Sequence, residues 1–321
     1  MKKWFHNLKI GLKIGLVVSL VLILGLGSVM LVTISNVRTT TQQDAENRLG
    51  ELSNARASYV DEYILQFRQF YKGAATMQVI VDALADPDDP VKVAAAQTAL
   101  EAYMASRTDM EGMYISTPET YIIAHTNKQA IGSSISDDPE LWADRKAGVE
   151  AAEDNVWFRG AIVSTSTGEI VGNIYAGVYD AKGNFLGFLG GGCYLQNLTE
   201  QVYAMDLNGY EKADAYLISV ENENYVMSAE SEEVGEPITS DDYEILTAAE
   251  KSDKGVLEYT DAETGEISLL AYEYLPDLDM IFYICDTESE IYADVNALTF
   301  KIMGLCVIVL ILSLLVIIFI T

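Results

Sequence analysis

Arginine side chains in an acidic stretch of the sequence are the strongest candidates for binding a ligand. Arg145 falls in a predicted helix at 139–152, and Arg159 lies at the start of a predicted strand at 158–164. A planar guanidinium can donate two parallel hydrogen bonds to one carboxylate, so each residue suits a small acidic ligand. The alternative for Arg145 is an ion pair with a carboxylate on the surface of its own helix.

Aromatic and polar residues near these arginines could complete a pocket, because ligand pockets need apolar walls and a few placed polar groups. Trp142 and Trp157 could form such walls, although tryptophans are also typical of a hydrophobic core. The polar candidates are His125, Ser164 and Tyr175. We predict ligand contacts for all of these residues, with Arg159 and Trp157 holding a small carboxylate or a ring.

Catalysis is not expected from these residue types. His125, Ser164 and an aspartate could be combined into a hydrolase triad. However, no Gly-x-Ser-x-Gly turn surrounds Ser164, and the run at 164–167 (STST) is typical of a polar turn. The three cysteines lack the spacing of a metal site. We therefore expect no enzyme activity, no metal and no cofactor.

The charge of the chain limits its partners. The sequence holds 48 Asp and Glu residues against 20 Lys and Arg residues, and every acidic residue lies within 35–301. A surface with this excess of negative charge repels nucleic acid. Acidic clusters such as 86–89 lack the ligand spacing of a calcium loop. We expect a small molecule and the lipid bilayer as partners, and no nucleic acid.

Two uncharged apolar runs bracket the acidic segment. Residues 14–34 and 302–320 are each long enough to cross a hydrocarbon core of about 30 Å as a helix. Lysines precede the first run, which predicts a cytoplasmic segment at 1–13 and an extracytoplasmic segment at 35–301. A cleaved signal peptide would have a shorter apolar run. We predict a multi-pass protein of the cell inner or plasma membrane.

A long amphipathic helix follows the first apolar run. Ala45, Leu49, Tyr63 and Phe67 belong to a stripe of residues that recur at steps of three and four. We predict a stalk or spine helix over 35–85, whose first part contacts a second copy of the chain and whose later part packs on a sheet. The alternative is a monomeric helix that lies along its own domain.

Strand and turn patterns predict two similar sheet modules after the spine. The clearest pattern is a hairpin at 169–195, where a polar turn at 180–183 (DAKG) joins two apolar runs. A weaker version of the same order repeats after roughly a hundred residues, the length of a small domain. We predict an α+β fold with tandem PAS-like antiparallel-sheet modules, a membrane-distal one at 86–206 and a membrane-proximal one at 207–286. Each sheet would carry helices on one face. A connecting helix at 287–301 would lead into the second span.

This layout resembles a known family. The run at 178–191 (VYDAKGNFLGFLGG) is similar to the PVYD-x-x-G-x-x-x-G-V-x-G run of the double Cache (dCache) extracellular sensor domains of bacterial transmembrane receptors. The run at 9–14 (KIGLKI) resembles the entry of methyl-accepting chemotaxis proteins. The resemblance implies a sensor that binds a small molecule in the distal module, and we expect this sensor to be a homodimer. It also implies that the signal passes through the long helix to the second span.

The amino-acid pocket of this family is not matched position by position. Members that bind α-amino acids resemble one another in an Arg-x-Trp-Tyr run, whereas 141–145 reads LWADR. A Tyr-x-Asp before a Thr-Gly turn is replaced by 162–164 (IVS), and an aspartate late in the last strand aligns with Gly192. A carboxylate that would neutralise an ammonium group is therefore absent at both positions. The resemblance implies a sensor whose ligand is not bound as α-amino acids commonly are.

The expected role is the ligand-sensing part of a bacterial transmembrane chemoreceptor. The same sensor module also precedes histidine kinases and diguanylate cyclases, which are the alternative outputs. An adhesive module is a third class, although display would need no second membrane span. No HAMP linker, methylation helix, kinase or cyclase signature follows Thr321. We therefore expect the cytoplasmic output on a further segment or on another polypeptide.

Overall fold

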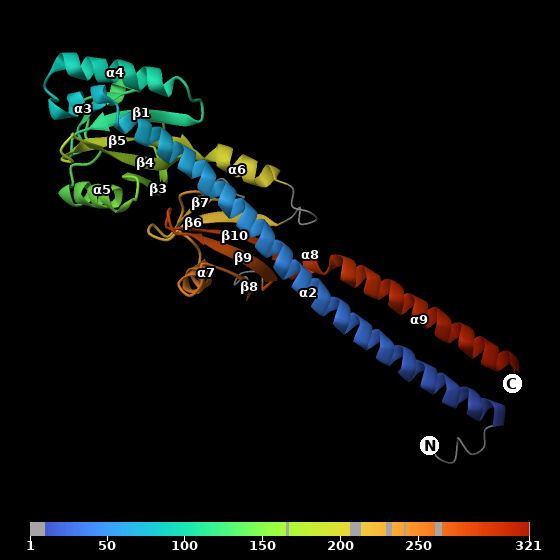
Figure 1. Cartoon of the computed structure of the whole chain (residues 1–321). Helices are drawn as coiled ribbons and strands as arrows, with labels where there is room; N and C mark the ends of the chain where they lie inside the picture. Colours follow the sequence, from blue (N-terminus) through green and yellow to red (C-terminus); the bar gives the residue numbers. More distant parts are fainter. Residues whose placement is uncertain are drawn as a thin grey trace.

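The computed structural model of the chain describes residues 10–164, 167–205, 213–228, 233–240, 242–260 and 265–320. Its axis is α2 (Ile10–Ala75), a single helix of 66 residues that is about 100 Å long. The first proline of the sequence is Pro87, so nothing in this stretch removes a helical hydrogen bond. Both sheet modules lie along one half of α2, and α9 (Ala293–Ile320) runs beside the other half (Figure 1).

Two shorter helices follow α2 at the end far from the chain termini. The long helix ends at Ala75, so the continuous spine is shorter than the predicted 35–85, and α3 (Gln78–Ala85) is a separate element. The next helix, α4 (Pro90–Met104), begins with proline at its first position. Its N-cap is Asp89, whose carboxylate accepts a hydrogen bond of 2.9 Å from the backbone N–H of Val91.

The distal sheet has five strands in the order β2-β1-β5-β4-β3, and every neighbouring pair is antiparallel. The predicted hairpin is confirmed as β4 and β5. In its turn, the carboxylate of Asp180 accepts hydrogen bonds of 2.8 Å from the backbone N–H groups of Lys182 and Asn184, and Gly183 adopts a φ of +83°. The strands are β1 (Met110–Ser116), β2 (Ile122–His125), β3 (Val156–Val163), β4 (Ile170–Tyr179) and β5 (Phe185–Tyr194).

The proximal sheet repeats this topology. It also has five strands, in the order β7-β6-β10-β9-β8, and α6 (Leu195–Ala204) connects the two sheets. The strands are β6 (Asp214–Ser219), β7 (Asn224–Met227), β8 (Lys254–Thr260), β9 (Ile267–Leu275) and β10 (Met280–Thr287). The predicted boundary at 206 lies outside the described residues.

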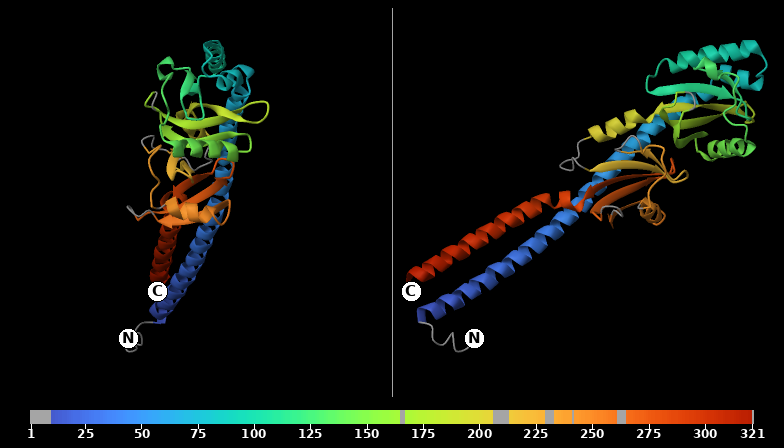
Figure 2. Two further views of the ribbon diagram at one scale, coloured as in Figure 1. Left: turned by 90° about the vertical axis from the view of Figure 1, so that its left-hand side faces the viewer. Right: turned by 180° about the vertical axis from the view of Figure 1, so that it is seen from behind.

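Helices cover both faces of each sheet, so the prediction of helices on one face is wrong. On one face of the distal sheet, Ile174 joins a core with Phe67 of α2. On the other face, Tyr175 packs with Val149 of α5 (Pro139–Ala151). In the proximal sheet, α7 (Asp242–Ala249) occupies the face opposite α2 (Figure 2). The reason is that alternate residues of the central strands are apolar on both faces, and both sets must be buried.

The apolar stripe of α2 is covered by the sheets of the same chain. Ala45 and Leu49 are almost fully buried, as are Ile64 and Phe67, and they share one core with both modules. The helix thus lies along its own domains, and the predicted contact between its first part and a second copy stays a prediction. The stripe is used internally because the proximal sheet, like the distal one, has an apolar face that needs cover.

Among the described residues, two helices are long and apolar enough to cross a membrane, namely the N-terminal part of α2 and the body of α9. Their apolar side chains are exposed, as at Leu31 and Leu315. A short α8 (Glu288–Ile291) precedes α9, which then runs unbroken from Ala293, so the predicted connecting helix and second span form one element. Most of the predicted cytoplasmic segment, residues 1–9, lies outside the described residues.

Candidate functional site

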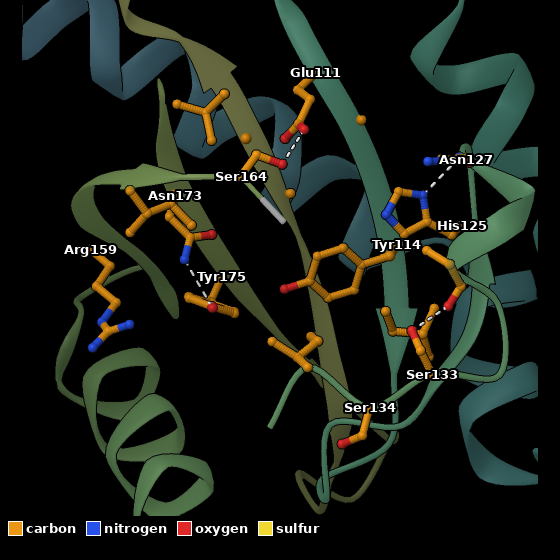
Figure 3. Close-up of a pocket in the computed structure, with 18 of the residues that line it drawn as sticks. Glu111, Tyr114, His125, Asn127, Ser133, Ser134, Arg159, Ser164, Asn173 and Tyr175 are labelled. Atoms are coloured by element: carbon orange, nitrogen blue, oxygen red, sulfur yellow. Dashed lines mark hydrogen bonds between the residues drawn. The ribbon is translucent and has the colours of Figure 1, made fainter. Parts of the chain in front are cut away.

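A cavity of about 540 Å³ opens on the face of the distal sheet that lies opposite α2 (Figure 3). Strands β1, β5 and β4 form its floor, and α5 and the loop with the short helix η1 (Lys128–Ala130) form its walls. Several predicted site residues meet here, from four different elements. They are His125, Arg145, Arg159, Ser164 and Tyr175.

The two tryptophans that were predicted as pocket walls do not line this cavity. The indole N–H of Trp142 donates a hydrogen bond of 2.7 Å to the backbone carbonyl of Ser136. Trp157 packs under α5, where a side chain at Gly148 would overlap its ring, and it stacks at 6.0 Å on Tyr175. Trp157 therefore supports the ring of a cavity residue, while Trp142 fixes the loop before α5.

Arg145 is a buried cation that lines the cavity. Its side chain projects from α5, and the residue is only 6% exposed. The guanidinium lies over the ring of Tyr175, at 5.4 Å from its centroid. Its Nε and Nη1 atoms have no hydrogen-bond partner among the described residues. A buried cation with unused donors is costly unless another group pairs with it. The alternative of a surface ion pair on α5 is not seen among the described residues, where Glu150 pairs with Lys146 instead.

Arg159 lines the cavity from β3. Its guanidinium is 5.8 Å from the ring centroid of Trp157, and its buried Nε has no partner within the described part of the chain. The next residue, Gly160, adopts a φ of +106° at an irregularity in the pairing of β3 with β4. Two arginines with unused donors thus face one cavity from different elements.

His125 is held as a neutral imidazole. Its Nδ1 accepts a hydrogen bond of 2.7 Å from the backbone N–H of Asn127, and its ring stacks on Tyr114. Burial lowers the pKa of His125, an effect that the negative charge of Glu111 opposes. Because Nδ1 is an acceptor, the ring proton lies on Nε2, which leaves one N–H donor for a bound molecule.

Ser164 and His125 do not form a nucleophile and base pair. The hydroxyl of Ser164 donates its hydrogen bond to the carboxylate of Glu111 rather than to His125. Tyr175, the other predicted hydroxyl, accepts a hydrogen bond of 2.9 Å from the side-chain amide of Asn173. This arrangement orients polar groups toward a cavity, and it contains none of the proton-transfer geometry that a hydrolase triad needs.

Glu111 is the residue of this site that sequence reasoning missed. Regular alternation would place Glu111 on the core side of β1 together with Met113, which is fully buried. However, the pairing of β1 with β5 shifts between Met110 and Gly112, so that two residues of β1 oppose Gly192. Such a β-bulge re-aims a side chain, and it turns the Glu111 carboxylate into the cavity.

The glycine run of β5 makes room for these groups. A side chain at Gly190 would overlap the phenol of Tyr114, which lies across this position. A Cβ at Gly192 would lie 2.7 Å from Cγ2 of Val171 and 3.1 Å from Oε2 of Glu111. The carboxylate of Glu111 thus occupies the space into which residue 192 would project. Residue 192 itself carries no carboxylate, as expected, but Glu111 of another strand brings one to this part of the cavity.

Comparisons with known proteins agree with this fold. The Cache-domain family model (dCache_1) matches residues 37–295. The sensor domain of the V. cholerae histidine kinase DctB has a TM-score of 0.57 at 11% identity, over 77% of this chain and 98% of that domain. None of the curated proteins matches the sequence.

Two chemoreceptor ligand-binding domains have the same fold. That of Pseudomonas fluorescens CtaA, in complex with L-isoleucine, has a TM-score of 0.56 at 15% identity, over 80% of this chain and 98% of that domain. That of Campylobacter jejuni Tlp3, in complex with L-valine, has a TM-score of 0.55 at 14% identity, over 79% of this chain and 96% of that domain. At these identities the likeness concerns the fold alone.

Proposed function

Since the chain belongs to the Cache-domain family, whose members are sensor domains rather than enzymes, we propose that it is the ligand-sensing part of a bacterial transmembrane chemoreceptor. In this proposal the distal cavity binds a small molecule with a carboxylate group. The sensing segment at 35–301 lies outside the inner or plasma membrane, residues 14–34 and 302–320 span it, and the receptor works as a homodimer.

The observation that carries the proposal is the buried guanidinium of Arg145. Its Nε and Nη1 are buried beside the cavity that the residue lines, and neither atom has a partner among the described residues. A carboxylate ligand would supply both the negative charge and the acceptor oxygens that this group lacks. Arg159 and the N–H of His125 could reach the same ligand from other walls of the cavity.

Contacts between β3 and its surroundings support signal transmission from this cavity. Asn222 of the proximal module donates a hydrogen bond of 2.7 Å to the backbone carbonyl of Arg159. Arg68 of α2 forms an ion pair of 2.7 Å with Asp154, just before β3, and both side chains are largely buried. A ligand that moves β3 would therefore bias both the proximal module and α2 between pre-existing arrangements.

A histidine kinase sensor is the second candidate for the output. It is favoured by the likeness to the sensor domain of the histidine kinase DctB. Both outputs would use the same distal cavity, so the ligand proposal does not depend on this choice.

We expect Arg145→Ala to weaken the binding of pentanoate by roughly 100-fold, because truncating one partner of a buried charge pair typically costs several kcal/mol. Isothermal titration calorimetry on the full chain in lipid nanodiscs would measure this change. Lys146→Ala is the matched control, since Lys146 is the adjacent cation on α5 and is half exposed beside Glu150. Pentanoate that fails to bind the wild-type chain, or that binds Arg145→Ala equally well, would contradict the proposal.

A further inference from the structure

We propose that Glu111 forms a cation-binding pole of the distal cavity, and that the ligand is an ω-amino acid whose ammonium group lies several bonds away from its carboxylate. This inference rests on the proposed function, which assigns the carboxylate to Arg145. It adds the second charged group of the ligand and the spacing between the two.

The carboxylate of Glu111 is held in place by hydroxyl groups. Ser164 and Thr167 both donate hydroxyl hydrogen bonds to its Oε1, that from Thr167 at 2.7 Å. The other oxygen, Oε2, has no hydrogen-bond donor among the described residues. It lies 3.1 Å from the position that a Cβ at Gly192 would take, in a part of the cavity that this glycine lines. Hydroxyl donors fix the orientation of a carboxylate but do not neutralise it.

No cation in the described part of the chain pairs with this carboxylate. Within the described residues, Glu111 forms no ion pair with a lysine or arginine. His125 faces the same cavity, but its Nδ1 is an acceptor, so the imidazole is neutral. A negative charge that is half-buried in a cavity is stabilised by an opposite charge nearby. The missing partner of Glu111 is therefore a cation on the ligand.

The carboxylate of Glu111 and the guanidinium of Arg145 lie at different ends of the cavity. The cavity-facing residues of β4 are Val171, Asn173 and Tyr175, and successive members of this row lie about 7 Å apart. Arg145 lies over Tyr175, at one end of the row. Glu111 lies beside the space between Val171 and Gly192, near the other end. The two charged groups are therefore on the order of 10 Å apart.

Figure 3 shows that the second arginine also lies away from Glu111. Glu111 and Ser164 lie together at one end of the cavity, and Asn173 lies between them and Arg159. The amide of Asn173 and the hydroxyl of Tyr175 are bonded to each other. The middle of the cavity is thus polar but uncharged, and the charged groups are at its ends.

This spacing decides between classes of ligand. An α-amino acid holds its charged groups roughly 3 Å apart, and two hydrogen bonds of about 2.8 Å extend its reach too little to join both poles directly. The nitrogen of an extended 5-aminopentanoate lies roughly 6 Å from the carboxyl carbon, which is sufficient. The cavity of about 540 Å³ has room for such a chain.

Two constitutional isomers test the proposal, because 5-aminopentanoate and 2-aminopentanoate carry the same charges at different spacings. Pentanoate, which lacks the amine, is the reference. Calorimetry on the full chain in nanodiscs is expected to give at least tenfold tighter binding for 5-aminopentanoate than for either of the others. In Glu111→Gln this advantage should vanish while the affinity for pentanoate is kept.

The variants separate the effect of the Glu111 charge from a change in shape and from long-range electrostatics. Glutamine keeps an oxygen that can accept from Ser164 and Thr167, so Glu111→Gln removes the charge with little change in shape. Glu119→Gln is the control, since Glu119 is an exposed residue of the same module and its loss tests for long-range electrostatics.

Each outcome decides the inference. Tighter or equal binding of 2-aminopentanoate, or an unchanged advantage of 5-aminopentanoate in Glu111→Gln, would overturn the cation pole. If pentanoate still binds through Arg145 in that case, the proposed function stands. If none of the three compounds binds, both the cation pole and the carboxylate assignment fail.

Discussion

Replacing Gly191 with alanine is expected to lower the free energy of unfolding by about 3 kcal/mol, at the upper end of the usual cost of overpacking. A Cβ at this position would overlap the backbone carbonyl of Gly112 and lie 2.5 Å from the hydroxyl of Tyr71. Neither neighbour can move freely, because Gly191 pairs with Met113 in the sheet and Tyr71 is fully buried in α2. Chemical unfolding of the chain in detergent micelles would measure the change.

A glycine in open surroundings provides the control for this prediction. Gly50 lies in the middle of α2, and no atom lies within 4 Å of its would-be Cβ. Because glycine is a poor helix former, Gly50→Ala should instead raise the stability by about 0.5–1 kcal/mol. Equal stabilities of Gly191→Ala and Gly50→Ala would contradict the close packing of β1, β5 and α2 beneath the cavity.

Asp242→Ala is expected to cost about 3 kcal/mol of stability in the proximal module, because it would leave two buried donors without an acceptor. The carboxylate of Asp242 is 5% exposed and accepts hydrogen bonds from the hydroxyls of Tyr225 (2.5 Å) and Tyr283 (2.6 Å). Burial, reinforced by this carboxylate, raises the pKa of both phenols, so both remain donors. The same unfolding measurement would report the loss.

The control for this prediction removes an acid from the same helix turn. Glu244 is exposed on α7, so Glu244→Ala should change the stability by less than about 0.5 kcal/mol. The affinity of Asp242→Ala for pentanoate should match the wild type, because distant sites act independently. An Asp242→Ala chain as stable as Glu244→Ala would show that the tyrosine hydroxyls do not depend on this carboxylate.

Local patterns in the sequence predicted the elements that depend on local physics. The hairpin of β4 and β5 follows from the Asp180 turn with Gly183. Helix α5 forms within the predicted helix at 139–152, where the carboxylate of its N-cap Asp138 accepts from the backbone N–H of Glu140. The repeat of two five-stranded sheets is also visible in the order of strands and helices. In each case neighbouring residues supply both the signal and the interaction.

The features that the sequence did not reveal depend on distant pairing. Glu111 faces the cavity only because β1 bulges against Gly192, a residue far away in the chain. Trp142 and Trp157 have the residue type of pocket walls, yet contacts with Ser136 and Gly148 place them outside the cavity. Arg145 was predicted to reach a ligand, but its burial and its unused donors could be seen only in the folded chain.

The central claim is that the guanidinium of Arg145 holds the carboxylate of a ligand in the distal cavity. A structure of the chain with pentanoate bound tests this claim most directly. We predict the ligand in the cavity between α5 and β4, with its carboxylate oxygens about 3 Å from nitrogens of Arg145. Pentanoate bound outside the distal module, or within the cavity with its carboxylate turned away from Arg145, would contradict the claim.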